Sequence, residues 1–221
     1  HIDKQKPRPR ISLQSAIGIG KKALETKIKK DPRHIPVEEK LSLLKDIERA
    51  VTIKQIVSTV VSYSESYSRI KYESSEGVDR EYELLRTGFS VSAVAKEGGV
   101  MQIARRRNFG VCGYEIMDQN PIAIAAEAAN CAQQLLKAKT ARGGHFPVLM
   151  DQELAGVFIH EALGHAAEAD TVLEGNSILE GKIDTKIAPE LINVHGDPTI
   201  NGFGYYPFDD EGVEAKRTAI I

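Results

Sequence analysis

The chain has 221 residues, of which 42% are hydrophobic and 27% are charged, proportions typical of a globular protein with a buried core. It contains no apolar run long enough to span a membrane, and its first residues lack the apolar stretch of a secretory signal. Its formal net charge of −2 gives no general reason to bind nucleic acid. Cys112 and Cys131 are too few for a disulfide framework, so we expect a reducing, cytoplasmic location.

The first part of the chain is basic, because lysine and arginine far outnumber acidic residues up to Arg33. Such a run is usually a solvated face or a flexible arm, and a nucleic-acid-binding patch is the alternative. Residues 15–30 have mixed helical character, so we assign residues 1–35 to a basic linker or helix region. The first residue is not Met, and residues 214–221 end inside a predicted strand. We therefore expect a fragment of a longer protein.

A helix is predicted to begin at Pro36, which suits a first helical turn, with Glu38 and Glu39 near the positive end of the helix dipole. Its apolar residues follow helical spacing and predict one stripe that packs on a core: Leu41, Leu44, Ile47 and Val51.

Between Ile53 and Tyr114 the pattern predicts strands at residues 57–64, 69–73, 82–85, 89–95 and 100–106. Turns are expected at Ser75–Gly77, Thr87–Gly88 and Gly98–Gly99. Short turns between consecutive strands predict an antiparallel meander. We expect Arg105, Arg106 and Arg107 to extend into water, with binding of a phosphate or a peptide carboxylate as the alternative.

A second helix is predicted to begin at Pro121, with Ile122, Ala125, Ala129, Ala132 and Leu136 facing the core and Cys131 a buried, unreactive thiol. Residues 141–144 form a candidate domain boundary, followed by a short strand at 145–150. The predicted fold class is α+β, an antiparallel-rich sheet with packed helices followed by the start of a second α+β domain that carries a metal-binding helix. We expect residues 36–142 to be part of the first domain and residues 143–221 to begin the second.

The strongest chemical signal is His160-Glu161-Ala162-Leu163-Gly164-His165. Asp151 can cap the helix that carries it, and Glu153 adds charge at the favoured end. Two histidines five residues apart lie about 140° apart on a regular helix, so two ligands to one ion require a local change of pitch. A π-type turn near Gly164 would bring His165 round, and Gly164 removes a side-chain obstacle to it.

A metal ion held by His160 and His165 would make a bound water acidic and polarise a peptide carbonyl. Glu161 could then take the proton of that water and pass it to the leaving amine. A third ligand is needed, and the candidates have no diagnostic spacing: Glu168, Asp170, His195, Cys112 and Cys131. The alternative is a buried, hydrogen-bonded His160 beside a surface charge at Glu161.

The block from Val157 to Asp170 resembles the signature of the TldD/PmbA proteins, on the TldD side, because the TldE partner lacks this metal motif. Residues 196–199, 202–204 and 208–212 resemble the next patterns of that family in the same order. The resemblance implies a zinc-dependent metallopeptidase of the HExxxH type that hydrolyses small or unfolded peptides. It implies His160 and His165 as ligands, Glu161 as the catalytic residue, and one zinc per full-length chain.

The resemblance also implies a homodimer, or a heterodimer with a TldE/PmbA-type subunit, and an extended peptide bound along a strand edge. The third metal ligand of the family is a Cys outside this chain, so we expect weak or absent metal binding and no activity from the chain alone. For the Asp209-Asp210-Glu211-Gly212 stretch we expect a turn, with a lining of the substrate cavity as the alternative, and His195 is expected in a loop. The rival function is a non-catalytic interaction protein, of the DNA gyrase modulator type or a structural partner subunit.

Overall fold

The computed structural model describes residues 22–24 and 28–221. The described residues up to Lys139, together with Thr199–Ala215, form one compact unit, and Thr140–Pro198 with Lys216–Ile221 form another. Much of the basic start of the chain lies outside the described residues. Within the predicted helical stretch, Lys22–Leu24 is instead strand β1, which pairs in parallel with residues 80–82. No helix in the described ranges has both the length and the apolar character needed to cross a bilayer.

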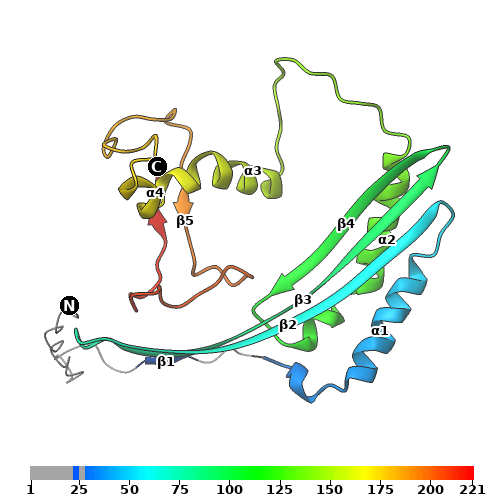
Figure 1. Ribbon diagram of the computed structural model, residues 1–221, viewed down its shortest axis with the longest axis horizontal. Helices are drawn as coiled ribbons and strands as arrows, with labels where there is room; N and C mark the ends of the chain where they lie inside the picture. Colours follow the sequence, from blue (N-terminus) through cyan, green and yellow to red (C-terminus); the bar gives the residue numbers. More distant parts are fainter. Residues whose placement is uncertain (1–21, 25–27) are drawn as a thin grey trace, which may run out of the picture. The chain divides into compact units, whose positions relative to one another are not determined.

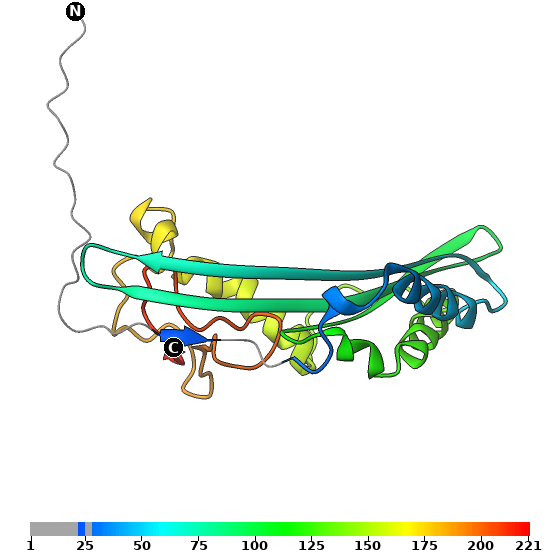
Figure 2. The ribbon, with the colours of Figure 1, turned by 90° about the horizontal axis from the view of Figure 1, so that it is seen from below.

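The four-stranded sheet of the first unit consists of the short strand β1 and three long antiparallel strands (Figure 1). The long strands are β2 (Ile56–Glu73), β3 (Asp79–Glu97) and β4 (Val100–Gly110). Central β3 pairs with β2 along most of its length and with β4 along its second half, and Figure 2 shows the β2–β3 hairpin from the side. The predicted turns at Ser75–Gly77 and Gly98–Gly99 are confirmed, the latter with φ of +55° and +87°, as a tight hairpin requires.

The predicted turn at Thr87–Gly88 is wrong, because β3 runs through it without interruption. Gly88 is paired with Phe109 on β4, and a β-carbon on Gly88 would lie 2.1 Å from Cδ1 of that ring. The glycine therefore serves a close approach of the phenyl ring across the strands and does not reverse the chain. The predicted strands at 57–64 and 69–73 are likewise one continuous strand.

Strand β3 buries one face in its first half and the opposite face in its second half. In its first half Tyr82 and Leu84 pack with Phe208, whereas in its second half Phe89 and Val91 belong to the main core. The alternation changes phase between Leu84 and Leu85, which are both buried. A change of phase resembles a strand break in the sequence, which explains the wrong turn prediction.

Two helices, drawn together at one end of the sheet in Figure 1, complete the main core: α1 (Val37–Ala50) and α2 (Pro121–Leu135). Both begin as predicted, with Pro36 immediately before α1 and Asn120 accepting a hydrogen bond from the N–H of Ala123 to cap α2. The core-facing residues of the two helices differ in part from the predicted ones. Leu41 and Ile122 are about half exposed, whereas Leu43 and Ala128 pack on the core. Cys131, predicted to be buried, is only partly buried against that core.

Short 3-10 turns flank these helices: η1 (Pro32–His34) precedes α1, and η2 (Tyr114–Asp118) precedes α2. The hydroxyl of Thr87 lies 3.0 Å from the carbonyl oxygen of Cys112 and 2.9 Å from that of Gly113, so it fastens the start of η2 to β3. The carboxylate of Glu115 accepts hydrogen bonds from the N–H groups of Lys29 and Lys30 and fixes the chain that leads into η1.

Residues 199–215 return to the first unit and cover the first half of β3. Arg86 donates hydrogen bonds to the carbonyl oxygens of Phe203 and Tyr205, and Arg80 donates to that of Gly212. The Asp209-to-Gly212 stretch is the expected turn, since Asp209 Oδ1 accepts from the N–H groups of Glu211 and Val213. The sequence carries no local signal for this return.

The second unit contains the motif helix α3 (Gln152–Ile159), the π turn η3 (His160–Gly164), the 3-10 turn η4 (His165–Ala167) and α4 (Ala169–Leu173). Short strands β5 (His195–Gly196) and β6 (Thr218–Ala219) pair antiparallel. Residues 145–150 belong to no helix or strand, so the strand predicted there is wrong. The predicted α+β class, with an antiparallel sheet and packed helices, is confirmed.

Candidate metal centre

The helix that carries the histidines begins at the predicted cap. Asp151 accepts a hydrogen bond of 2.8 Å from the N–H of Leu154, and Glu153 lies in the first turn. This cap satisfies one of the free N–H groups at the helix start and favours the two acidic side chains there. The start of α3, and with it the position of His160 one residue beyond its end, is therefore determined by residues of this same helix and its cap.

The change of pitch predicted from the histidine spacing is present. Residues His160–Gly164 form a π turn, in which the N–H of His165 donates to the carbonyl oxygen of His160. A hydrogen bond between residues five apart places the two ends of the motif on the same side of the helix. The imidazole rings meet edge to face, with their centroids 4.5 Å apart.

The π turn brings three potential metal ligands together. One ligand atom from each of His160, Glu161 and His165 lies within 4.8 Å of the other two, and His165 Nε2 is 3.9 Å from Glu161 Oε2. The side chains of Glu161 and His165 are 66% and 53% exposed. The alternative of a buried, hydrogen-bonded His160 is wrong, because that histidine is exposed.

Glu168 contacts the opposite nitrogen of His165. Its Oε1 lies 3.1 Å from His165 Nδ1, so a proton on Nδ1 is donated to the carboxylate. In that tautomer Nε2 keeps its lone pair and faces the side of Glu161. Carboxylates in this position commonly orient metal-binding histidines, so Glu168, a candidate third ligand, has the geometry of a supporting residue.

Ser177 holds the backbone that follows His165. Its hydroxyl donates to the carbonyl oxygen of Ala166 at 2.5 Å and accepts from the N–H of Leu179 at 3.0 Å. Ser177 is buried, with 9% of its surface exposed. A buried hydroxyl with both roles satisfied ties the turn η4 to the loop after α4 and limits the movement of His165.

The expected role of Gly164 needs correction. Its φ of −53° and ψ of −53° are ordinary for any residue. A β-carbon there would lie 3.5 Å from His160 Nδ1, which is normal van der Waals contact. Glycine is therefore not required by the backbone of the π turn, although a larger side chain would crowd the ring of His160.

The other candidate ligands lie elsewhere. The side chain of Asp170 accepts from the N–H of Thr171 at the start of α4, and His195 is on β5. Cys112 Sγ is 3.4 Å from the hydroxyl of Thr87 in the first unit, and Cys131 is on α2. None of these four belongs to the cluster around His160 among the described residues.

The cluster fits part of a zinc site. Two ligand atoms bound to tetrahedral zinc lie about 3.4 Å apart, and exposed side chains can close the remaining distance by rotation. Two imidazoles beside a carboxylate suit a divalent ion of this kind. A catalytic zinc takes three protein ligands and a water, and the described residues bring no third imidazole or thiolate to this cluster.

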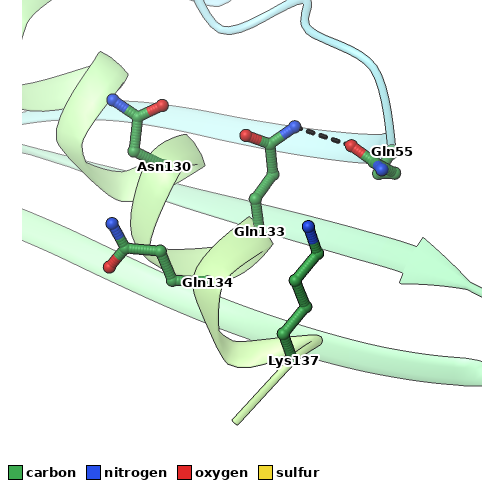
Figure 3. Close-up of a pocket in the computed structure, with 5 residues that line it drawn as sticks. All are labelled: Gln55, Asn130, Gln133, Gln134 and Lys137. Carbon is green, nitrogen blue, oxygen red and sulfur yellow. Dashed lines mark hydrogen bonds between the residues drawn. The ribbon is translucent and has the colours of Figure 1, made fainter.

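A separate polar pocket of about 300 Å³ lies between the C-terminal half of α2 and the residues before β2 (Figure 3). Its lining consists of amides and one ammonium group: Gln55, Asn130, Gln133, Gln134 and Lys137. Gln133 Nε2 donates to Gln55 Oε1 at 2.8 Å, and Gln55 Nε2 donates to Glu97. These side-chain hydrogen bonds hold Gln55 at a φ of +73° and connect α2 to the sheet. We therefore assign a packing role to these residues.

Comparison with known proteins gives two matches to family models. The PmbA/TldA metallopeptidase central domain matches residues 30–136, and the PmbA/TldA metallopeptidase C-terminal domain matches residues 143–221. A metalloprotease of Archaeoglobus fulgidus is 42% identical over 195 residues, which cover 88% of this chain and 45% of that protein. A zinc metalloprotease TldD homolog of Saccharolobus solfataricus is 30% identical over 192 residues, which cover 83% and 42%. The chain thus spans less than half the length of these relatives.

Solved structures show the same fold. A Thermotoga maritima protein described as a candidate modulator of DNA gyrase gives a TM-score of 0.76 at 22% identity, covering 96% of this chain and 49% of that chain. TldE of Thermococcus kodakarensis gives 0.59 at 19% identity, covering 99% and 45%. The central and C-terminal domain models match consecutive stretches that together take in most of the chain, and curated metalloproteases align over the same range, so the chain belongs to the TldD/PmbA family.

Proposed function

We propose that the protein is a TldD-type metallopeptidase subunit that hydrolyses peptide bonds of small or unfolded peptides. The observation that carries the proposal is the approach of His160, Glu161 and His165 to within 4.8 Å across a π turn. Relatives named metalloprotease, one of them a zinc metalloprotease TldD homolog, support zinc as the metal.

Each residue of the cluster has a proposed role. His160 and His165 would hold the zinc, with Glu168 orienting the ring of His165 through Nδ1. Zinc held there would lower the pKa of a bound water and polarise the peptide carbonyl. Glu161 would accept the proton of the attacking water and deliver it to the leaving amine, a general base and acid in turn.

The third ligand is proposed to be a Cys outside this chain, so the chain by itself should bind zinc weakly and turn over no peptide. We propose that the active assembly is a dimer, either of one kind of chain or with a TldE/PmbA-type subunit. The fold shared with TldE of Thermococcus kodakarensis supports a partner of related structure.

Zinc titration with a competing chelator tests the metal site. His160→Ala and His165→Ala should each abolish the zinc binding that the chain retains, while Glu161→Gln and the exposed control Glu180→Gln should leave it unchanged. If zinc binding is the same in the two histidine variants as in the wild type, these histidines are not ligands.

Peptide turnover tests the role of Glu161 in a chain extended through the expected cysteine. Glu161→Gln should lower kcat by about two to four orders of magnitude, which is the usual contribution of a general base. Retained zinc with lost turnover supports the proposal, and an active Glu161→Gln variant contradicts it. Salt-sensitive DNA binding in the absence of metal would favour the rival interaction protein.

A further inference from the structure

Where the second half of β3 lies, one face of the sheet is covered and the other is exposed. Helices α1 and α2 pack on the side that contains Phe89 and Val91 (Figure 1). Directly opposed residues of antiparallel strands lie on the same side of a sheet, so the register identifies the residues of the other side. We term that side the open face and define it by six residues: Val60 and Ser62 on β2, Ser92 on β3, and Ile103, Arg105 and Arg107 on β4.

The open face has positive charge and no carboxylate. Two of its six residues are arginines and none is acidic, although the whole chain has a formal net charge of −2. Arg105 and Arg107 are both exposed. Arg106 lies on the opposite face, where its Nε is 3.7 Å from the carboxylate of Glu127 on α2. The open face is therefore complementary in charge to an acidic ligand.

The guanidinium of Arg105 is oriented by the central strand. Its Nε donates a hydrogen bond of 2.9 Å to the hydroxyl of Ser92, which is partly buried. The two terminal nitrogens of Arg105 have no partner among the described residues. These terminal N–H groups form the planar fork that binds a carboxylate through two parallel hydrogen bonds. Arg105 is thus held in a geometry suited to one carboxylate.

Apolar side chains on the same face give a second, independent indication of a ligand. Val60, directly across β3 from Arg105, is 57% exposed, and Ile103, two residues before Arg105, is 56% exposed. Met101 continues this row along β4 and is 59% exposed. Single exposed apolar residues are ordinary, but several gathered on one sheet face are typical of an interaction surface. A ligand that covers them would gain from removing them from water.

The spacing of these side chains matches an extended peptide. Ile103, Arg105 and Arg107 follow one another at every second residue of β4, which corresponds to about 7 Å between neighbours. The alternate side chains of an extended peptide repeat at the same distance. A peptide lying along β4 on the open face can therefore place an aliphatic side chain on Ile103, one carboxylate on Arg105 and the next beside Arg107.

We propose that the open face binds an extended stretch of the peptide substrate that has acidic side chains at alternate positions next to an aliphatic one. This inference rests on the proposed function, because it names the class of peptide that the metallopeptidase receives. A single-stranded nucleic acid fits less well, because its bases bind to sheets by stacking on aromatic rings. The six residues include no such ring, and the neighbouring Phe109 already packs edge to face on Phe203 at 5.4 Å.

Fluorescence anisotropy tests binding, with the heptapeptide Leu-Ser-Glu-Ser-Glu-Ser-Leu labelled with an uncharged dye. This sequence reads the same in both directions, so it does not depend on the direction in which the peptide lies. The neutral isostere Leu-Ser-Gln-Ser-Gln-Ser-Leu is the ligand control and should bind at least about threefold more weakly, as expected for lost exposed ion pairs. Equal affinity for the two peptides, or no binding of either, overturns the proposal.

Variants assign the contacts. Arg105→Gln should weaken binding of the glutamate peptide about threefold and leave that of the glutamine peptide unchanged. Arg106→Gln, the same change on the same strand but on the opposite face, is the matched control and should have no effect. Ile103→Ser should weaken both peptides equally. If Arg105→Gln and Arg106→Gln have equal effects, or if a single-stranded oligonucleotide binds more tightly than the peptide and depends on Arg105, the proposal is wrong.

Turnover in a chain extended through the expected cysteine shows whether the bound peptide is the substrate. For an internally quenched peptide that contains the glutamate heptapeptide, Arg105→Gln should raise KM about threefold and leave kcat unchanged, because it removes uniform binding. An unchanged KM would overturn the role in substrate binding. If the extended chain cleaves no peptide at all, the proposed function fails, whereas Arg105-dependent binding in the anisotropy measurement would still support the site.

Discussion

Replacing Gly212 by alanine should destabilise the first unit through two effects that can be separated. Gly212 has a φ of +77°, a conformation that costs a residue with a β-carbon about 1–2 kcal/mol. A β-carbon would also lie 2.5 Å from Val78 Cγ1 and 3.0 Å from Tyr72 Cδ1. Overpacking of this kind costs about 1–3 kcal/mol, so the expected loss for Gly212→Ala is about 2–5 kcal/mol.

Gly98→Ala is the matched control, because Gly98 also has a positive φ, of +55°, but a β-carbon there meets nothing within 4 Å. It should lose only the conformational part, about 1–2 kcal/mol. Urea unfolding followed by far-UV circular dichroism gives both free energies of unfolding. Hydrogen exchange at the N–H of Val213, which donates to Asp209, reports on the turn itself. If the two variants lose the same free energy and Val213 stays protected in both, residues 199–215 are not held against β2 and β3 as described.

Three further changes have definite expected outcomes. Glu168→Gln should lower the zinc affinity of the His160 cluster about tenfold or more, measured by chelator competition, whereas Glu180→Gln should not change it. Thr87→Val should lower the free energy of unfolding by about 2 kcal/mol in urea titrations, because the carbonyl groups of Cys112 and Gly113 lose a buried donor, and Thr87→Ser should lose less. Burial raises the pKa of Glu115, but hydrogen bonds from backbone N–H groups outweigh it and hold the pKa below 4.5. A carboxyl group whose pKa is lower in the folded state stabilises the fold at pH values above its unfolded-state pKa, and this stabilisation is lost as the pH falls below about 4.5. The free energy of unfolding of Glu115→Gln should therefore depend less on pH in the acid range than that of the wild type.

The features predicted correctly from sequence are set by neighbours along the chain. Pro36 and Asn120 mark the starts of α1 and α2, and Asp151 caps α3 by a bond to the N–H of Leu154. The π turn follows from the same logic, because a five-residue spacing of two ligands is incompatible with a regular helix. Local geometry therefore sufficed for most of the candidate metal centre.

The errors come from contacts between distant segments. Thr87 and Gly88 resemble a turn sequence. The residue types at these positions are instead explained by contacts with Cys112, Gly113 and Phe109, which are more than twenty residues away. The change of buried face along β3 depends on residues 199–215, whose return to the first unit has no local signal. Glu168 could have been identified as a supporting residue from its helical spacing to His165.

The exposure of the metal cluster decides what it can do. Glu161 and His165 are more than half exposed, so water screens the charges at this site. Electrostatic interactions there are therefore much weaker than those in a water-excluded catalytic site. The proposed hydrolysis therefore needs other protein surface to cover the cluster, as well as the proposed third ligand to complete it. The π turn and Glu168 supply the part that must be in place beforehand, two imidazoles held on one side of a helix with one ring oriented.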